Sequence, residues 1–311
     1  MSDRPSSMKI VFIHGINQQN LDAIALKQYW LEVLQLGFQN LNCTRMLSEC
    51  SLEFPFYGDV LEHYGLRNTL NIGSFTFNQT PSKPLHSLLK PHLLDLTTTN
   101  QTPFLPRFLS NPNLSFSSKI YLLSQMAKDY VLKDFIMMLN YFPKLHEDLM
   151  HEFIVEAYLY LSNHQFIDEV NCRIRQCLKT DEDYLIVAHS LGTVVAYNVI
   201  RQLPAHFRLK AIITLGSPLA FHVIQSKIPQ PIVYPDCLHG HWYNFYSPDD
   251  FVSCFALDAP PFQFEQAIIN HSIRTFLVDP HDISGYLQHP AVIQCIVETL
   301  SNPEQKPIVL T

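Results

Sequence analysis

The chain has 311 residues, of which 47% are hydrophobic and 16% are charged, and its formal net charge is −7. This composition supplies enough apolar residues for one large domain, or for one domain that carries an insertion. Acidic and basic residues are mixed along the chain without a basic stripe, so nucleic acid is not expected as a partner.

The N-terminal segment lacks the features of a secretory signal, because no basic stretch followed by an apolar run precedes the first predicted strand. Charged residues interrupt every apolar run before it reaches the length of a membrane span. The cysteines number seven and are scattered, which favours free thiols over a disulfide framework. We therefore expect a cytoplasmic protein.

Short apolar runs alternate with helical patterns in two parts of the chain. Continuous apolar runs are typical of strands buried on both faces of a parallel sheet. The strand candidates, in chain order, are residues 9–13, 51–56 (the weakest), 184–188, 211–215 and 242–246. Helices are expected at residues 21–36, at residues 191–203 up to Pro204, and from about His289 onward. This alternation predicts an α/β fold with a doubly wound, mostly parallel sheet.

The alternation stops between the second and third strand candidates. Residues 67–118 are rich in Asn, Ser, Thr and Pro, whereas residues 119–176 have a helical pattern with one apolar stripe. We expect residues 1–60 and 179–311 to form the sheet domain and residues 61–178 to form a large, mainly helical cap inserted into it. The apolar residues of the cap suit either an acyl pocket or simple packing against the sheet.

The segment Ala188-His189-Ser190-Leu191-Gly192 joins a predicted strand directly to a predicted helix. Small residues two positions before and after Ser190 allow a very tight backbone turn. Such a strand, turn and helix form the context of a nucleophile elbow, which presents a reactive serine at the end of a sheet. The alternative is an ordinary turn in which Ser190 caps the helix.

A serine nucleophile needs a base within hydrogen-bond reach and a third group that orients the base. Asp250 is the first candidate for the acid and Asp249 the second, because a predicted buried strand runs into the turn that contains them. Both aspartates also suit a solvated turn. His281 is the candidate base, since it lies in a loop before the last predicted helix; His271 and His289 are its competitors.

Acyl transfer also needs backbone N–H groups directed at the developing oxyanion. Leu191, directly after the candidate nucleophile, supplies one, and Ile16, in the loop after the first predicted strand, is expected to supply the other. The residues expected to contact substrate around these donors are His14, Gly15, Asn17 and His189. The alternative for the first loop is that His14 and Gly15 merely end the strand.

A rival cluster, which would bind a metal, consists of Asp236, Cys237, His239 and His241. Alternating histidines can share a metal ion. However, the cluster precedes a predicted buried strand and no second cluster completes a site. A polar loop is therefore the preferred interpretation, and no metal is expected.

Five segments taken together resemble the α/β-hydrolase superfamily, in its lipase- and esterase-like branch: IVFIHGIN, AHSLGTVVAYN, TLGSPL, NFYSPDDFVS and HDISGYLQHPAV. The resemblance covers residues 8–60 and 180–300, and Ala188 stands where a glycine is more usual. The residues to which it assigns the roles of nucleophile, base, acid and the two oxyanion donors are Ser190, His281, Asp250, Ile16 and Leu191.

The expected activity is hydrolysis of a carboxylic ester through an acyl-enzyme, without a cofactor. The expected substrate is a small-molecule ester, either lipid-like or with a medium-chain acyl group. Amides, thioesters and phospholipids are alternative substrates for the same residues. A binding protein that retains the fold without turnover is another alternative. A third is a protein whose insertion docks on a membrane surface. The oligomeric state is left open.

Overall fold

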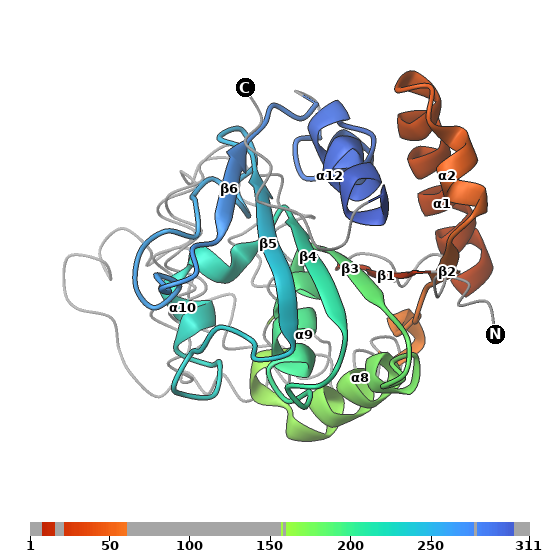
Figure 1. The fold of residues 1–311 in the computed structure, drawn as a ribbon. Coiled ribbons are helices and arrows are strands. Elements are labelled where there is room, and N and C mark those ends of the chain that lie inside the picture. Colours follow the sequence, from red (N-terminus) through yellow and green to blue (C-terminus); the bar gives the residue numbers. More distant parts are fainter. Residues whose placement is uncertain (1–7, 16–21, 61–156, 158–159, 277–278, 302–311) are drawn as a thin grey trace, which may run out of the picture. The chain divides into compact units, whose positions relative to one another are not determined.

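The computed structural model describes residues 8–15, 22–60, 157, 160–276 and 279–301 (Figure 1). The strands within these residues are β1 Lys9–Ile13, β2 Ser51–Glu53, β3 Tyr184–His189, β4 Leu209–Leu215, β5 Leu238–Tyr246 and β6 Ile269–Ser272. The helices are α1 Ala23–Asn40, α2 Thr44–Ser48, α8 His164–Gln176, α9 Leu191–Ile200, the 3-10 helix η3 Pro218–Ala220, α10 His222–Gln225, α11 Ile283–Leu287 and α12 Pro290–Ser301.

The six described strands form one sheet in the order β2-β1-β3-β4-β5-β6, and each neighbouring pair is parallel. This arrangement confirms the predicted α/β class with a mostly parallel sheet. The central strands are continuous apolar runs because helices cover the sheet on both sides. All six residues of β3, for example, are buried.

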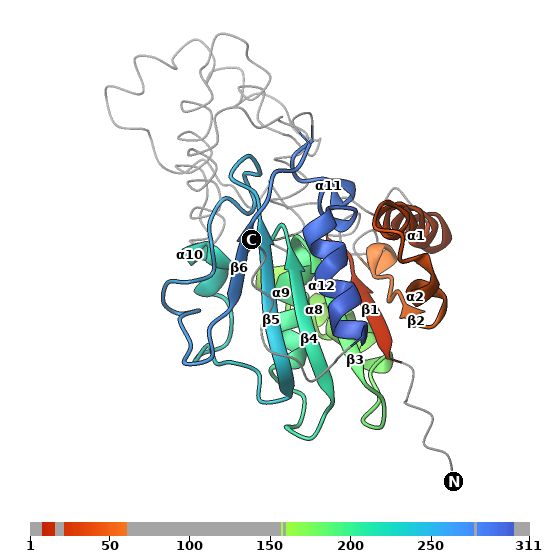
Figure 2. The same ribbon diagram turned by 45° about the horizontal axis from the view of Figure 1, so that its top comes forward.

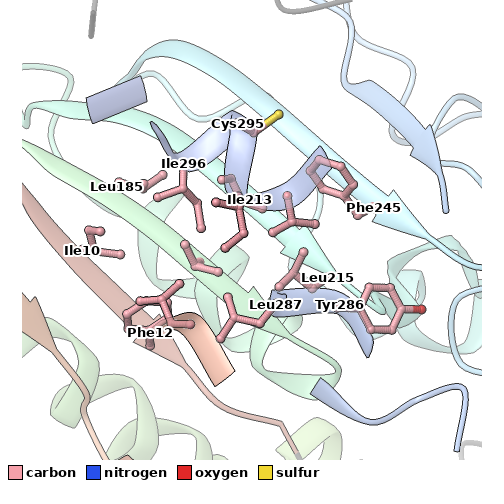
Figure 3. Packing of buried hydrophobic residues seen from close by; sticks show 14 of the residues in the cluster. Ile10, Phe12, Leu185, Ile213, Leu215, Phe245, Tyr286, Leu287, Cys295 and Ile296 are labelled. Carbon is pink, nitrogen blue, oxygen red and sulfur yellow. The ribbon is translucent and has the colours of Figure 1, made fainter. Parts of the chain in front are cut away.

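Helices α1, α11 and α12 lie on one face of the sheet, and α8 and α9 lie on the other (Figures 1 and 2). On the first face, alternate strand residues such as Phe12, Val187 and Ile213 pack with these three helices in one apolar cluster, part of which Figure 3 shows. The intervening strand residues point to the opposite face, because side chains alternate along a strand. There α9 is buried at all ten of its positions.

Two predicted helices differ from the structure at their ends. Helix α1 continues beyond residue 36 to Asn40, because Phe38 is fully buried in the apolar cluster. Helix α9 ends at Ile200, and a turn leads from there to Pro204. Helix α11 was not predicted, since it has only five residues and includes Gly285.

The strands differ from prediction at the edges of the sheet and at the start of β5, which begins at Leu238, four residues before the predicted segment 242–246. Strand β2 is shorter than the predicted segment 51–56. Strand β6, which was not predicted, has the sequence INHS and is not fully buried at any position. An edge strand of this kind carries no continuous apolar run, so its pattern resembles that of a loop.

Contacts divide the chain into two compact units, one formed by Met1–Glu62 with Leu159–Thr311 and the other by His63–Tyr158. The sheet belongs to the first unit, and nearly all of the second lies outside the described residues. The predicted cap of residues 61–178 therefore lies largely outside them as well. Its last part does not: α8 belongs to the unit with the sheet, and it buries Phe166, Val170 and Ile174.

All seven cysteines are free thiols, as expected, although only Cys237 and Cys295 are buried. Within the part of the chain that the structure describes, no helix is both long enough and apolar enough to cross a membrane.

Candidate active site

The candidate site lies where the strand order of the sheet reverses. The chain runs from β1 outward to β2 and then returns to pair β3 on the other side of β1. In open α/β sheets, ligands bind outside the carboxyl ends of the strands at such a reversal. Ile13 is in register with Ala188, so Gly15 after β1 and Ser190 after β3 follow at the same edge.

Ser190 occupies a backbone conformation that non-glycine residues rarely adopt, with φ 55° and ψ −132°. Such a conformation costs about 1–3 kcal/mol and persists only where the surroundings enforce it. Here the Ser190 N–H donates to Leu215 O at 3.0 Å, and the Ser190 carbonyl accepts from the Thr193 hydroxyl at 2.8 Å. The Ser190 side chain makes no hydrogen bond that caps α9, so it is free for another partner.

Two glycines allow the close approach of β1 to this turn. A Cβ atom on Gly15 would lie 2.5 Å from the Cβ atom of Ser190. A Cβ atom on Gly192 would lie 2.3 Å from the carbonyl oxygen of His14. Both distances are too short for carbon contacts, so the small residue after the turn and the small residue after β1 are required by packing.

Ser190, His281 and Asp250 form one hydrogen-bonded chain. His281 Nε2 lies 2.7 Å from Ser190 Oγ, and His281 Nδ1 lies 2.8 Å from Asp250 Oδ2. An ionised carboxylate only accepts hydrogen bonds, so Nδ1 carries the imidazole proton and Nε2 is free to accept the serine proton. All three residues are buried, with Ser190 and Asp250 at 0% exposure.

Asp250 is held by several donors besides His281. Val252 N–H donates to Oδ1 at 2.9 Å, while the Ser253 and Tyr286 hydroxyls donate to Oδ2 at 3.0 and 2.5 Å. Burial alone would raise the pKa of Asp250, but the charge and hydrogen bond of His281, together with these donors, hold that pKa below its usual value. The carboxylate is therefore ionised at neutral pH.

The other acid and base candidates point elsewhere. Asp249 pairs with Arg274, whose Nη1 lies 2.9 Å from Asp249 Oδ2. His271 lies on β6 and stacks on Phe245. His289 accepts a hydrogen bond from Ala291 N–H at 3.2 Å, at the start of α12. Only Asp250 and His281, among the candidates named from the sequence, reach Ser190 through hydrogen bonds.

His189, the last residue of β3, supports His281 from behind. Its Nε2 lies 2.9 Å from the carbonyl oxygen of His281, and the centroids of the two rings are 4.9 Å apart. Because a carbonyl only accepts, Nε2 carries the proton. Burial lowers the pKa of His189 to about 3, and the nearby His281 adds to the shift. This neutral ring is bonded to the backbone of His281, and the substrate contact expected from the sequence stays a prediction.

His14 is also committed to contacts within the protein. Its Nε2 accepts from Tyr57 N–H at 3.1 Å, and its Nδ1 donates to Gly15 O at 2.9 Å. The Tyr57 hydroxyl donates to the His14 carbonyl, and the two rings stack with centroids 3.9 Å apart. Burial lowers the pKa of His14 to about 4, so the ring is neutral at pH 7. His14 therefore holds the end of β1 and Gly15 against Tyr57.

Of the two expected oxyanion donors, the described residues include Leu191 but not Ile16. Leu191 is the first residue of α9, where backbone N–H groups have no partner within the helix. Ile16 and Asn17 lie outside the described residues. Gly15, the last described residue before them, lies directly against the Ser190 side chain.

The rival metal cluster is dispersed in the structure. Cys237 Sγ donates to Ile200 O at 3.4 Å, and His239 Nε2 lies 3.1 Å from Phe207 O. Asp236 is exposed, and His239 and His241 lie on β5 itself. Among the described residues no three His, Cys, Asp or Glu side chains are grouped as a metal site would require.

Sequence reasoning missed three residues that brace the chain of hydrogen bonds. Ser253 and Tyr286 donate to Asp250, and Thr193 donates to the Ser190 carbonyl. Ser253 and Thr193 lie three residues after the groups that they support. That spacing was the one available signal, and it is common to many turns and helix starts.

This geometry can activate a serine hydroxyl. Proton transfer from Ser190 Oγ to His281 Nε2 creates an imidazolium next to the Asp250 carboxylate, and that ion pair stabilises the product of the transfer. The arrangement therefore suits nucleophilic attack on an electrophilic carbon. The sequence matches no family model, and a comparison with curated proteins finds no match.

Proposed function

We propose that the protein is a serine hydrolase of the α/β-hydrolase type that cleaves carboxylic esters. The observation that carries this proposal is the hydrogen-bonded chain from Ser190 through His281 to Asp250, with distances of 2.7 and 2.8 Å. Its position at the carboxyl edge of the sheet, where the strand order reverses, supports the same proposal.

In the proposed reaction Ser190 Oγ forms a bond to the acyl carbon while its proton moves to His281 Nε2. Backbone N–H groups at Leu191 and in the loop after Gly15 stabilise the oxyanion. The alcohol then leaves with the proton from His281, and an acyl-enzyme remains. Water attacks this ester as His281 accepts one proton, and Ser190 regains its hydroxyl when the acid departs. No step uses a cofactor.

The proposed substrate is an ester with an apolar acyl group. An aromatic side chain beside the chain of hydrogen bonds supports this preference: the Phe251 and His281 ring centroids are 5.8 Å apart. Amides, thioesters and phospholipids would react through the same groups. The expected cap, residues 61–178, has no part in this argument.

The test is labelling with a fluorophosphonate, which reacts with activated serines. We expect the intact protein to be labelled at Ser190 and the variants Ser190→Ala and His281→Ala to remain unlabelled, with intact mass and peptide mapping as the measurement. Labelling of a different residue, or an equal rate in His281→Ala, would contradict the proposal. An unlabelled but folded intact protein would favour the binding-protein alternative. A series of model esters of increasing chain length would then define the acyl preference.

A further inference from the structure

Tyr286 joins the apolar core to the buried carboxylate. Its ring is fully buried in the cluster that includes Leu215 and Leu287, and its hydroxyl points away from the apolar side chains (Figure 3). The hydroxyl oxygen lies 2.5 Å from Asp250 Oδ2. A ring anchored by packing loses little further freedom when its hydroxyl forms a bond, so the donor is held in place before the carboxylate meets it.

Ser253 completes a closed arrangement of three groups. Its Oγ lies 3.0 Å from Asp250 Oδ2 and 2.8 Å from the Tyr286 hydroxyl. With His281 Nδ1 at 2.8 Å, the single oxygen Oδ2 has three hydrogen-bonding neighbours. The other carboxylate oxygen has the backbone N–H of Val252. The oxygen Oδ2 therefore accepts from both the histidine and the two hydroxyls.

We propose that Tyr286 and Ser253 are a positioning pair that orients Asp250 toward His281 and weakens the field that Asp250 exerts on the imidazole. The two hydroxyl dipoles place their positive ends at the same oxygen that attracts the protonated ring. They stabilise the carboxylate, and they oppose the charge on His281. Loss of either hydroxyl is therefore expected to strengthen the attraction between the Asp250 carboxylate and the protonated ring. This inference deepens the proposed function. The kinetic test of the pair rests on the proposed ester hydrolysis.

Other titratable groups lie near the same carboxylate and imidazole. The His189 ring packs against His281, Cys254 follows Ser253, and Asp282 follows His281 and accepts from the Tyr29 hydroxyl at 3.0 Å. Asp249 is paired with Arg274. None of these groups changes in the variants below, so their contribution is the same on both sides of each comparison.

The decisive experiment is an NMR titration of the His281 ring in protein labelled with nitrogen-15 histidine. The chain has 15 histidines, and the His281→Gln variant assigns the resonance. We expect Tyr286→Phe to move the titration midpoint of His281 upward by about 0.5–1 pH unit, and Ser253→Ala to move it upward by less. A purely structural role would lower stability and leave the midpoint unchanged.

Tyr184→Phe is the matched control, because it also removes a hydroxyl with buried surroundings, whose partners are Lys179 N–H and Glu182 at the amino end of the sheet. Its His281 midpoint should equal that of the intact protein. An unchanged midpoint in folded Tyr286→Phe would overturn the inference. If that variant does not fold, Ser253→Ala decides: an upward shift supports the pair, and no shift rejects it.

Kinetics separate this inference from the proposed function. If the protein hydrolyses a model ester, the acid limb of its kcat/KM profile should move upward in Tyr286→Phe by the same amount as the NMR midpoint, with KM little changed. If no ester or fluorophosphonate reacts, the proposed function fails, while the NMR titration still accepts or rejects the role of the pair.

Discussion

The two ends of the sheet use charged and polar side chains in opposite ways. At the amino end, Lys9 pairs with Glu182 at 2.8 Å and Arg208 pairs with Asp183 at 3.0 Å, and these side chains are between 17% and 40% exposed. At the carboxyl end, the side chains of Asp250 and His281 are 0% and 9% exposed. The ion-pair distances at the two ends are similar, but the side chains at the amino end are more exposed to water.

Access to water determines how much an ion pair contributes and whether its protonation states are fixed. Exposed pairs contribute little free energy, because solvent screens them and their side chains lose freedom when they pair. In a buried chain the same contacts fix protonation states, since no water can replace a missing partner. The amino end therefore tolerates change, whereas each group at the carboxyl end has a defined proton and a defined partner. Four predictions test this contrast.

The largest effect is expected for Asp250→Asn, which keeps the shape of the side chain but removes the acceptor for His281 Nδ1–H. We expect the rate of fluorophosphonate labelling to fall about 10³–10⁴-fold, because the imidazole then adopts the wrong tautomer. Asp249→Asn is the matched control and should change the rate less than about twofold. Equal losses in the two variants would show that the hydrogen bond to His281 does not matter for reactivity.

The next effect concerns packing at the carboxyl edge. Gly192→Ala places a methyl group 2.3 Å from the carbonyl oxygen of His14, so either β1 or the start of α9 must shift. We expect the free energy of unfolding to fall by about 2–3 kcal/mol, measured by urea denaturation. Gln28→Ala, on the exposed face of α1, should stay within about 0.5 kcal/mol of the intact protein. A Gly192→Ala variant as stable as Gln28→Ala would mean that this edge is loosely packed.

The third effect is a loss of stability at mildly acid pH. The pKa of His14 is lowered to about 4 and that of His189 to about 3, against 6.5 in an unfolded chain. Below pH 6.5 these two histidines are protonated in the unfolded chain but stay neutral in the folded chain. The free energy of unfolding therefore decreases as pH falls. The slope approaches about 1.4 kcal/mol per pH unit for each histidine.

Urea denaturation at several pH values between 6 and 4.5 measures this slope. His189→Gln retains an N–H donor for the carbonyl of His281 and cannot be protonated, so its slope should be shallower by the contribution of one histidine. The contribution of Asp250 has the same sign in a lower pH range: its lowered pKa adds stability that is present above the usual value of 3.8 and is lost as pH falls through the folded value. A slope unchanged in His189→Gln would contradict the assignment.

The smallest effect is expected at the amino end. Glu182→Gln removes the charge that pairs with Lys9 and keeps a side chain that can still accept from the Tyr184 hydroxyl. We expect the free energy of unfolding to change by less than about 1 kcal/mol, and the labelling rate to stay the same. A larger effect would remove the contrast between the two ends.

The sequence predicts the interior of the sheet better than its margins. Strands β1, β3 and β4 and residues 242–246 of β5 are apolar runs that no exposed segment would carry, so the sequence locates them. The first four residues of β5 were predicted as a polar loop, because two histidines and a glycine interrupt the apolar pattern there. Strand β6 and helix α11 are short and partly polar, and their structures are set by the neighbours on which they pack. The local sequence pattern does not show which distant residues pack against these segments.

The sequence predicts the order of the site residues along the chain, but it does not predict the directions in which their side chains point. The sequence favours His281 over two other histidines and Asp250 over Asp249, without excluding the alternatives. The two aspartates differ only in the direction that the turn gives them: Asp249 faces Arg274, 25 residues away. Tyr286 is still less accessible to sequence reasoning, because a buried aromatic ring is ordinary core until its hydroxyl is seen to have a charged partner.

The spacing of the hydrogen-bonded chain along the sequence has a consequence for biosynthesis. Ser190 and His281 are 91 residues apart, and Asp250 precedes His281 by 31. A ribosome that has just released the turn after β3 has therefore not yet made the histidine, nor the strands that bring it back to the serine. During translation the hydroxyl remains an ordinary alcohol. Activation of the serine, as proposed, therefore coincides with closure of the last third of the fold, and a nascent chain truncated before His281 carries the serine without its partner.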